Sequence, residues 1–241
     1  MAVTEFFLVR HGESIGNVAA TRAELEQLEA IPLDLRDADV PLSDTGREQA
    51  EALGRWLTGR RDAIDEYWVS PYVRARETLA IALADESPDS PPAIDERIRD
   101  RELGILDLLT RRGVATRHPE EMERRRHLGK FYHRPPGGES WADVALRLRS
   151  FLRDRLDGPG EAVVVVAHDA VVMLLLYLLL GMREDELLDF AADRTVLNAS
   201  VTHLQFEDGA WHLRTFSDVA HLQREGADVT AHPGSPDVEP A

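Results

Sequence analysis

The segment Phe6-Phe7-Leu8-Val9-Arg10-His11-Gly12-Glu13-Ser14 decides how the rest of the chain is interpreted. Its first four residues are apolar, which is the pattern of a short strand buried on both faces. The strand ends in an Arg-His-Gly turn, so a cation, an imidazole and a flexible glycine follow its carboxyl end. Ligands bind at this end of the strands in open α/β sheets. The turn is therefore a candidate binding site, although a lone histidine in such a turn is more often structural.

A second histidine follows an apolar run much later in the chain. Ala162–Met182 is a stretch of 21 almost entirely apolar residues, long enough to imitate a membrane span. His168 and Asp169 interrupt it, and a charge near the centre of a membrane helix costs about 3 kcal/mol. The first part is rich in valine and typical of a strand, whereas the later part is rich in leucine and typical of a helix. We predict a strand at 162–167, a turn at His168 and a helix at 171–180.

Strand-like and helix-like segments alternate along most of the chain. Ser43 or Asp44 can cap a helix, Pro71 separates a short strand from the next helix, and Asp208-Gly209 is a hairpin signal. Further strands are predicted at 67–70, 198–206 and 211–216, and further helices at 18–29, from about 44 onward, after Pro71 and from 139 onward. This order predicts an α/β three-layer sandwich, with a mostly parallel central sheet, helices on both faces and an antiparallel hairpin at one edge.

The composition limits the classes of function. With 28 Lys and Arg against 44 Asp and Glu, the formal net charge is −16, which argues against nucleic acid or an anionic membrane as a partner. The sequence has no cysteine, so disulfides and thiol chemistry are excluded. The first residues do not resemble a signal peptide, and we expect a cytoplasmic protein. We predict one domain at 1–222, with a charged helical insert at about 113–138 over the active site, and a disordered acidic tail at 223–241.

The two strand-final histidines belong to a wider set of charged side chains. Arg10 precedes the first histidine, and Arg74 lies on the helix after the strand at 67–70. A carboxylate at Asp100 or Glu102 occurs in a third such region. Two imidazoles, two guanidiniums and a carboxyl group are what phosphoryl transfer through a phosphohistidine requires. No cluster of Asp, His or Cys has the spacing of metal ligands, so we expect neither a metal nor another cofactor.

The order of these motifs carries a family resemblance. The motifs are Arg10-His11-Gly12-Glu13-Ser14 with Asn17, Pro41-Leu42-Ser43-Asp44-Thr45-Gly46, Ser70-Pro71 with Arg74-Ala75 and Thr78, and the strand-final His168. Over about residues 5–220 the chain resembles branch 1 of the histidine phosphatase superfamily, the phosphoglycerate mutase-like family. The resemblance implies that fold and a phosphorylated small molecule as substrate. It also implies that His11 is the nucleophile, that Arg10, Arg74 and His168 hold the phosphoryl oxygens, and that Gly12, Ser14 and Asn17 contact the substrate.

The leaving alcohol needs a proton, so a carboxylic acid has to lie opposite His11. The family places a glutamate four residues before a glycine at this point, and counting back from Gly104 gives Asp100. Aspartate is one methylene shorter than glutamate, so Glu102 and Asp169 remain alternative donors, and we also count both among the predicted substrate-binding residues. We predict that Asp100 is the proton donor.

The resemblance leaves three functions open. The first is a metal-independent phosphatase that hydrolyses a small phosphomonoester, and the second is a phosphoglycerate mutase-type phosphoryl transfer. The third is a binding or regulatory protein that keeps the pocket without turnover. The run Arg101-Glu102-Leu103-Gly104 replaces the Arg-His-Tyr-Gly run of the mutases and favours the phosphatase. Arg124, Arg125 and Arg134 in the insert either contact a second anionic group of the substrate or form a solvated helix face. Family members are often dimers, which implies a possible homodimer.

Overall fold

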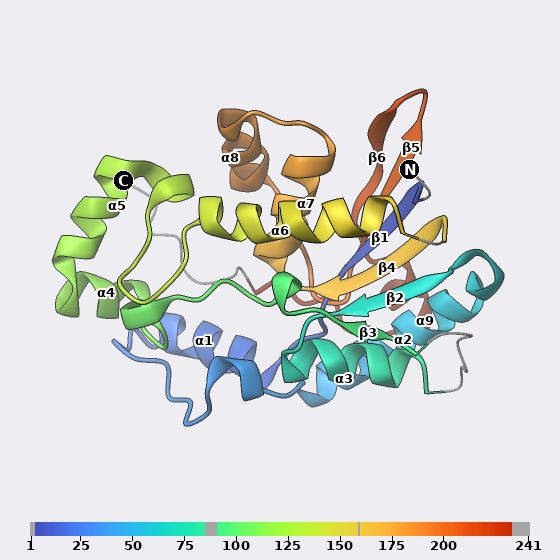
Figure 1. Cartoon of the computed structure of the whole chain (residues 1–241). Coiled ribbons are helices and arrows are strands. Elements are labelled where there is room, and N and C mark those ends of the chain that lie inside the picture. Colours follow the sequence, from blue (N-terminus) through green and yellow to red (C-terminus); the bar gives the residue numbers. More distant parts are fainter. Residues whose placement is uncertain (1–2, 85–90, 159, 233–241) are drawn as a thin grey trace.

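A computed structural model describes residues 3–84, 91–158 and 160–232, and shows a central sheet between two layers of helices (Figure 1). The strands are β1 (Glu5–Arg10), β2 (Glu66–Val69), β3 (Ala93–Ile94), β4 (Ala162–Ala167), β5 (Val201–Glu207) and β6 (Ala210–Asp218). The helices are α1 (Ile15–Leu25), α2 (Asp44–Thr58), α3 (Val73–Ala82), α4 (Arg111–Arg117), α5 (Pro119–Tyr132), α6 (Trp141–Leu156), α7 (Asp169–Leu179), α8 (Glu184–Asp193) and α9 (Ala220–Glu225). Short 3₁₀ turns are η1 (Asp37–Asp39), η2 (Arg61–Ala63), η3 (Glu96–Ile98) and η4 (Gly104–Leu106). The predicted α/β sandwich is confirmed.

The six strands lie in the order β3-β2-β4-β1-β5-β6. The pairs β3–β2, β2–β4 and β4–β1 are parallel, so these four strands end at the same edge of the sheet. β5 runs antiparallel to β1, and β6 runs antiparallel to β5. The predicted antiparallel hairpin therefore forms at one edge of the sheet, and the structure places it beside β1.

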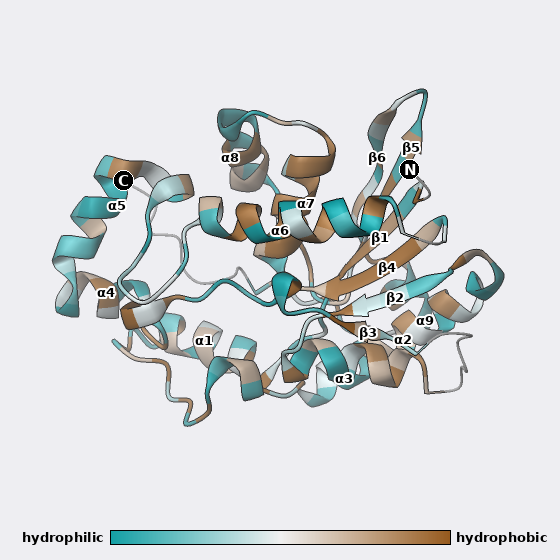
Figure 2. Ribbon diagram, viewed as in Figure 1, coloured by the Kyte–Doolittle hydropathy of each residue, from teal (hydrophilic) through white to brown (hydrophobic). Residues whose placement is uncertain are grey.

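The apolar residues of β1 alternate between two hydrophobic layers. Phe6 packs with Phe151 of α6 on one face of the sheet. Phe7 packs with Leu53 of α2 on the other face. In Figure 2, β4 at the centre of the sheet is largely brown, and brown and teal residues alternate along α6. Because each such side chain contributes about 1.5–3 kcal/mol when fully buried, an uninterrupted apolar run is what a strand covered on both faces requires.

The apolar stretch Ala162–Met182 forms a strand, a turn and a helix, as predicted. β4 is buried along its whole length and α7 follows directly after His168. Within the described part of the chain, no helix combines the length and the apolar character that crossing a bilayer would need.

α1 begins at Ile15, earlier than the predicted start at Val18, because Ser14 and Asn17 form a capping box. Ser14 Oγ accepts from Asn17 N, and Asn17 Oδ1 accepts from Ser14 N, both at 3.1 Å. The sequence signal was present, but the helix starts within the motif and not after it.

The charged insert folds as α4 and α5, with a kink at Gly129, whose φ is 77°. α5 packs against α6 and α8. In Figure 1 these helices lie at the end of the molecule toward which the parallel strands point.

The structure differs from the disordered tail predicted from residue 223. α9 includes Ala220–Glu225, and the following residues are fixed by hydrogen bonds to the domain. Gln49 Nε2 donates to Asp228 O at 2.8 Å and to Thr230 Oγ1 at 3.0 Å, and Asn198 N donates to Thr230 O at 3.2 Å. These bonds satisfy buried polar groups of the domain, which a composition-based prediction does not consider. Residues 233–241 of the predicted tail lie outside the described residues.

Candidate active site

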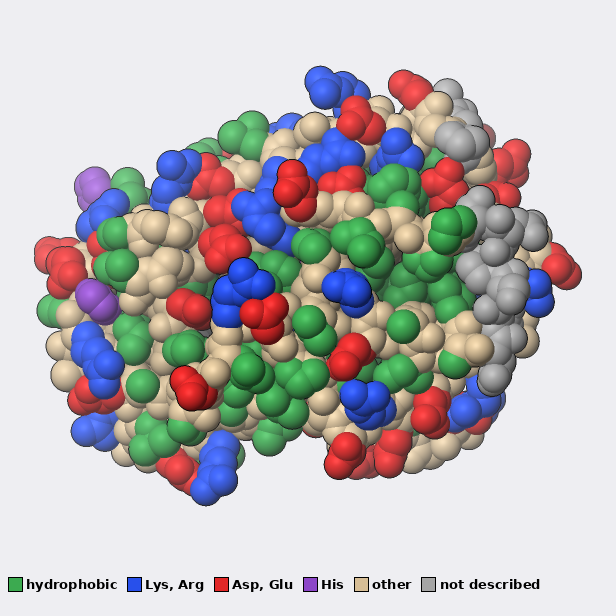
Figure 3. All heavy atoms as spheres, turned by 60° about the horizontal axis from the view of Figure 1, so that its bottom comes forward, with side chains coloured by type: hydrophobic (Ala, Val, Ile, Leu, Met, Phe, Trp, Pro, Cys, Tyr) green, Lys and Arg blue, Asp and Glu red, His purple; other side chains and the backbone are tan. Residues whose placement is uncertain are grey.

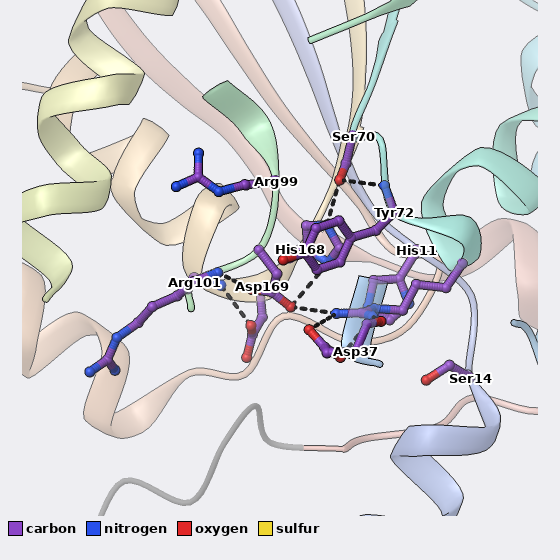
Figure 4. A network of polar contacts seen from close by, with 12 residues as sticks. His11, Ser14, Asp37, Ser70, Tyr72, Arg99, Arg101, His168 and Asp169 are labelled. Atoms are coloured by element: carbon purple, nitrogen blue, oxygen red, sulfur yellow. Dashed lines mark hydrogen bonds and ion pairs between the residues drawn. The ribbon is translucent and has the colours of Figure 1, made fainter. Parts of the chain in front are cut away.

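The register of the sheet brings the two strand-final histidines together. Arg10 pairs with Ala167, so His11 and His168, which follow them, lie side by side with ring centroids 5.2 Å apart (Figure 4). β2 ends beside them, and Ser70 Oγ lies 2.8 Å from His168 Nε2. Both imidazoles are buried, at 3% and 0% exposure. Two residues more than 150 positions apart thus form one site.

His11 is held as a neutral imidazole in one tautomer. Its Nδ1 lies 2.7 Å from the carbonyl oxygen of Gly12, which can only accept, so Nδ1 carries the proton. Nε2 keeps its lone pair and accepts from Arg74 Nε at 3.2 Å. Burial, together with the positive charges of Arg74, His168 and Arg10, lowers the pKa of His11 well below 6.5. His11 therefore presents a nucleophilic nitrogen at neutral pH.

Arg10 is buried, and its Nε is available to a ligand. Its Nη1 donates to Val196 O at 2.5 Å and its Nη2 to His232 O at 2.7 Å. Its Nε is buried and has no hydrogen-bond partner among the described residues. A buried N–H group without an acceptor is costly in a protein interior, and an anion at this position would satisfy it.

Arg74 lies at the start of α3, just after β2, and is 4% exposed. Its Nε donates to His11 Nε2. Its Nη1 donates to Asp37 O at 2.6 Å and to Asp37 Oδ1 at 2.9 Å. Its Nη2 donates to Asp37 Oδ2 at 3.2 Å and to Asp100 Oδ2 at 2.8 Å. Although burial lowers the pKa of Arg74, the two carboxylates raise it overall, so the guanidinium is charged.

Asp100 joins the second histidine to Arg74. Its Oδ2 lies 3.1 Å from His168 Nδ1, at ion-pair distance but without hydrogen-bond geometry. Burial raises the pKa of Asp100, but His168, Arg74 and the backbone N–H of Arg101 outweigh it and hold that pKa well below 3.8. Burial likewise lowers the pKa of His168, against the raising effect of Asp100. The carboxylate is therefore ionised in this arrangement.

Close backbone packing fixes the turn that carries His11. A Cβ on Gly12 would lie 2.6 Å from Gly46 O, and a Cβ on Gly46 would lie 1.9 Å from Glu13 O. Both glycines are therefore needed for the approach of the turn to α2. Gly12 N also donates to Thr78 Oγ1 at 3.0 Å, which ties the turn to α3.

Ser14 and Asn17 form the N-terminal cap of α1, which directly follows this turn. Asn17 Oδ1 also accepts from Asn198 Nδ2 at 3.3 Å, and the same Nδ2 donates to His11 O at 3.2 Å. In Figure 4, Ser14 lies apart from the paired imidazoles.

Glu102 and Asp169, the alternative proton donors, make other contacts. Glu102 Oε1 accepts from Tyr72 OH at 2.9 Å, and half of its side chain is exposed. Asp169 Oδ1 accepts from Ala170 N at 2.7 Å. Burial lowers the pKa of Arg10, and the charge of Asp169 opposes this shift, so the carboxylate lies near that guanidinium.

The three predicted substrate-binding arginines of the insert lie outside this constellation. Arg124 pairs with Glu121 at 2.7 Å, and Arg134 pairs with Asp143 of α6. Burial lowers the pKa of His133 and the charge of Arg125 lowers it further, so Arg125 lies near that imidazole.

Sequence reasoning did not find Asp37, Asn198 and His232, which also contact the site residues. Asp37 belongs to an acidic loop without periodicity, and His232 lies in the segment predicted to be disordered. For Asn198 a signal existed, because it lies three residues before the start of β5, the neighbour of β1. Ser70 likewise directly follows a strand, β2, at the edge of the sheet where the site lies.

Comparison with known proteins decides the family. The model of the histidine phosphatase superfamily (branch 1) matches residues 6–219. The chain belongs to this superfamily. It is 33% identical over 175 residues to 2,3-bisphosphoglycerate-dependent phosphoglycerate mutase 2 of Gloeobacter violaceus, which covers 70% of this chain and 72% of that protein. It is 30% identical over 226 residues to the metal-independent phosphoserine phosphatase of Arabidopsis thaliana, which covers 93% of this chain and 85% of that protein.

The fold comparison agrees with this assignment. The alpha-ribazole phosphatase from Shigella flexneri superposes with a TM-score of 0.71 at 22% identity, covering 89% of this chain and 96% of that one. Phosphatases and mutases thus both occur among the relatives by name.

Proposed function

We propose that this protein is a metal-independent phosphatase that hydrolyses a small phosphomonoester through a phosphohistidine on His11. One observation carries the proposal: the neutral His11 has its Nε2 turned to the guanidinium of Arg74. The unpartnered Nε of Arg10 and the imidazole of His168 complete a set of donors around one position. Such preorganised donors stabilise the charge on the equatorial oxygens of a transferring phosphoryl group.

In the first step His11 Nε2 forms a bond to phosphorus while the bond from phosphorus to the leaving oxygen breaks. The leaving oxygen takes a proton and departs as an alcohol. The phosphorylated ring is cationic, and its Nδ1–H remains bonded to Gly12 O, which stabilises it. In the second step a water molecule attacks phosphorus, the N–P bond breaks, and orthophosphate and neutral His11 are released.

Asp100 is the proposed proton donor of the first step and the acceptor of a water proton in the second. Its Oδ2 lies between Arg74 Nη2 and His168 Nδ1, the two groups proposed to hold the phosphoryl oxygens. In the free protein those groups keep Asp100 ionised. A phosphoryl dianion bound to Arg74 and His168 weakens this stabilisation and adds a like charge, and each effect raises the pKa of a carboxyl group.

The second candidate is a phosphoglycerate mutase-type transfer, which the likeness to the Gloeobacter violaceus protein favours. A mutase has to hold a substrate that carries a further anionic group. The local pairing of Arg124 and Arg134 with carboxylates supports the phosphatase over the mutase.

The test measures hydrolysis of a generic aryl phosphate in the presence of a metal chelator. It compares the wild type, His11→Ala and His212→Ala. His212 is an exposed histidine of β6 and serves as the matched control. We expect turnover that falls by about 10⁴-fold or more in His11→Ala and is unchanged in His212→Ala. Full activity of His11→Ala would exclude a phosphohistidine mechanism.

Rapid quenching separates the two candidates. A phosphoenzyme that water hydrolyses within the turnover time supports the phosphatase. A long-lived phosphoenzyme that needs a bisphosphate primer and passes its phosphoryl group to a sugar-acid phosphate would establish the mutase instead.

A further inference from the structure

All five N–H donors of Arg74 are used within the protein. One goes to His11 Nε2, one to the Asp37 carbonyl oxygen, two to the Asp37 carboxylate and one to Asp100. A phosphoryl group can bind to Arg74 only if some of these contacts are given up.

The two contacts of the Asp37 carboxylate are the ones that a phosphoryl group imitates. Oδ1 and Oδ2 accept from Nη1 and Nη2 of the same guanidinium. Arginine binds carboxylates and phosphates in this same bidentate manner. Asp37 thus places an anion of the chain on the arginine proposed to bind the anion of the substrate.

Asp37 can release Arg74 without unfolding its surroundings. Its side chain is 40% exposed, whereas that of Asp100 is 21% exposed. The backbone of η1 is held separately, because Asp37 O accepts from Arg74 Nη1 and from Val40 N. Rotation of the Asp37 side chain into solvent therefore frees two donors while the turn and Arg74 stay in place.

We infer that Asp37 is an internal competitor for the phosphate-binding arginine and thereby sets the affinity of the site for phosphomonoesters. This inference rests on the proposed function for its choice of ligand. In the free protein the carboxylate occupies Arg74, and a phosphoryl group binds to the fraction of molecules in which it has rotated away. The apparent dissociation constant is raised by the inverse of that fraction. Asp37 acts through Arg74 and is a positioning residue.

The experiment is calorimetric titration of the full-length protein with orthophosphate, comparing the wild type, Asp37→Asn and Asp39→Asn. Asp39 is the matched control, because it belongs to the same 3₁₀ turn but pairs with the exposed Arg36. Both variants remove one negative charge, and Asp37→Asn keeps the backbone contact to Arg74. Thermal unfolding checks that each variant is folded, and Asp37→Ser replaces Asp37→Asn if that variant is not.

We expect Asp37→Asn to bind orthophosphate about tenfold more tightly than the wild type, and Asp39→Asn to differ by less than about twofold. With an aryl phosphate, KM of Asp37→Asn should fall while kcat changes by less than about threefold. Weaker or unchanged orthophosphate binding by Asp37→Asn would overturn the inference, since Asp37 would then only hold Arg74 in position. Equal tightening by both variants would also overturn it, because it would reflect net charge alone.

Binding and turnover separate this inference from the proposed function. If the wild type shows no His11-dependent turnover but Asp37→Asn binds orthophosphate more tightly, the proposed function fails and the competition by Asp37 stands. If turnover depends on His11 but Asp37→Asn leaves orthophosphate binding unchanged, the competition by Asp37 fails alone.

Discussion

The edge of the sheet and the helical insert use arginine in opposite ways. Arg74, at the sheet edge, is buried and donates to His11, Asp37 and Asp100, which come from three distant segments. Arg124, on α5, has half of its side chain exposed and pairs with Glu121 within one helical turn. On the face drawn in Figure 3, basic and acidic side chains are likewise intermixed and form no large patch of one sign.

The difference teaches which charges a fold constrains. A buried guanidinium needs an acceptor for every donor, so its partners are fixed by the tertiary structure and each one matters. An exposed ion pair contributes between about 0 and 1 kcal/mol, because water and salt replace the partner easily. Substitutions at the two places should therefore differ greatly in effect.

Among the arginines of the two regions, the largest effect is expected for Arg74→Lys. Lysine keeps the charge but cannot supply five donors in a plane, so kcat/KM should fall by about 10²–10³-fold. Arg76→Lys, on the exposed side of the same helix, is the matched control and should be near wild type. Steady-state kinetics on an aryl phosphate measure both, and a small effect of Arg74→Lys would show that charge alone is sufficient there.

The next effect concerns a buried hydrogen bond described within the insert. Glu121 Oε2 lies 2.9 Å from His133 Nε2, and both side chains are about 3% exposed or less. Glu121→Ala leaves a buried imidazole nitrogen without its partner, so the free energy of unfolding should fall by about 1–3 kcal/mol. Glu120→Ala, at an exposed position on the same helix, should change it little.

Denaturant unfolding measures these free energies, and kcat/KM of the folded variants should stay near wild type. A large loss of turnover in folded Glu121→Ala would show that the insert takes part in catalysis and would contradict the contrast between the two regions.

A smaller effect concerns pH and stability. The native pKa of His11 is lowered well below 6.5, so below pH 6.5 the unfolded chain binds a proton that the native protein does not. The free energy of unfolding therefore falls as pH falls, by up to about 1.4 kcal/mol per pH unit for this group, until pH reaches the lowered pKa. Burial also lowers the pKa of His168, which makes the free energy of unfolding change with pH in the same direction.

His11→Asn removes one of the two imidazoles that take up a proton only on unfolding. The free energy of unfolding of this variant should therefore fall less steeply than that of the wild type as pH is lowered from about 6.5 to 5.5. Asp100 does not interfere, because its lowered pKa contributes stability that is lost only below its ordinary value of 3.8. Urea unfolding across this range measures the slopes, with His127→Asn on the exposed surface of α5 as control. Equal slopes in wild type and His11→Asn would mean that His11 is not held neutral.

The smallest effect is expected for the double variant Arg124→Ala, Arg134→Ala. Both arginines already have carboxylate partners, so KM should change by less than about twofold for any active substrate. A rise in KM confined to substrates with a second anionic group would show that the insert contacts them and determines specificity.

Much of the site could be predicted from the sequence because of one rule about strand ends. Apolar runs that stop at His11 and His168 identify two buried strands, and parallel strands end at one edge of the sheet. Arg10 and Arg74 follow from the same reasoning, since each lies within a few residues of a strand end. The arginines of the insert could not be placed in this way, since a charged helix has the same pattern whether it faces a substrate or solvent.

The sequence by itself determined the fold class, the family and the paired histidines, because periodicity and motif order are local properties of the chain. The tertiary structure decided the register that brings His11 beside His168, the tautomer of His11 and the partners of Arg74. It also placed Asp37 on that arginine and the His232 carbonyl on Arg10. These contacts join segments without periodicity to residues far away in the chain. A buried donor forms its hydrogen bond with whichever acceptor the completed fold brings within reach.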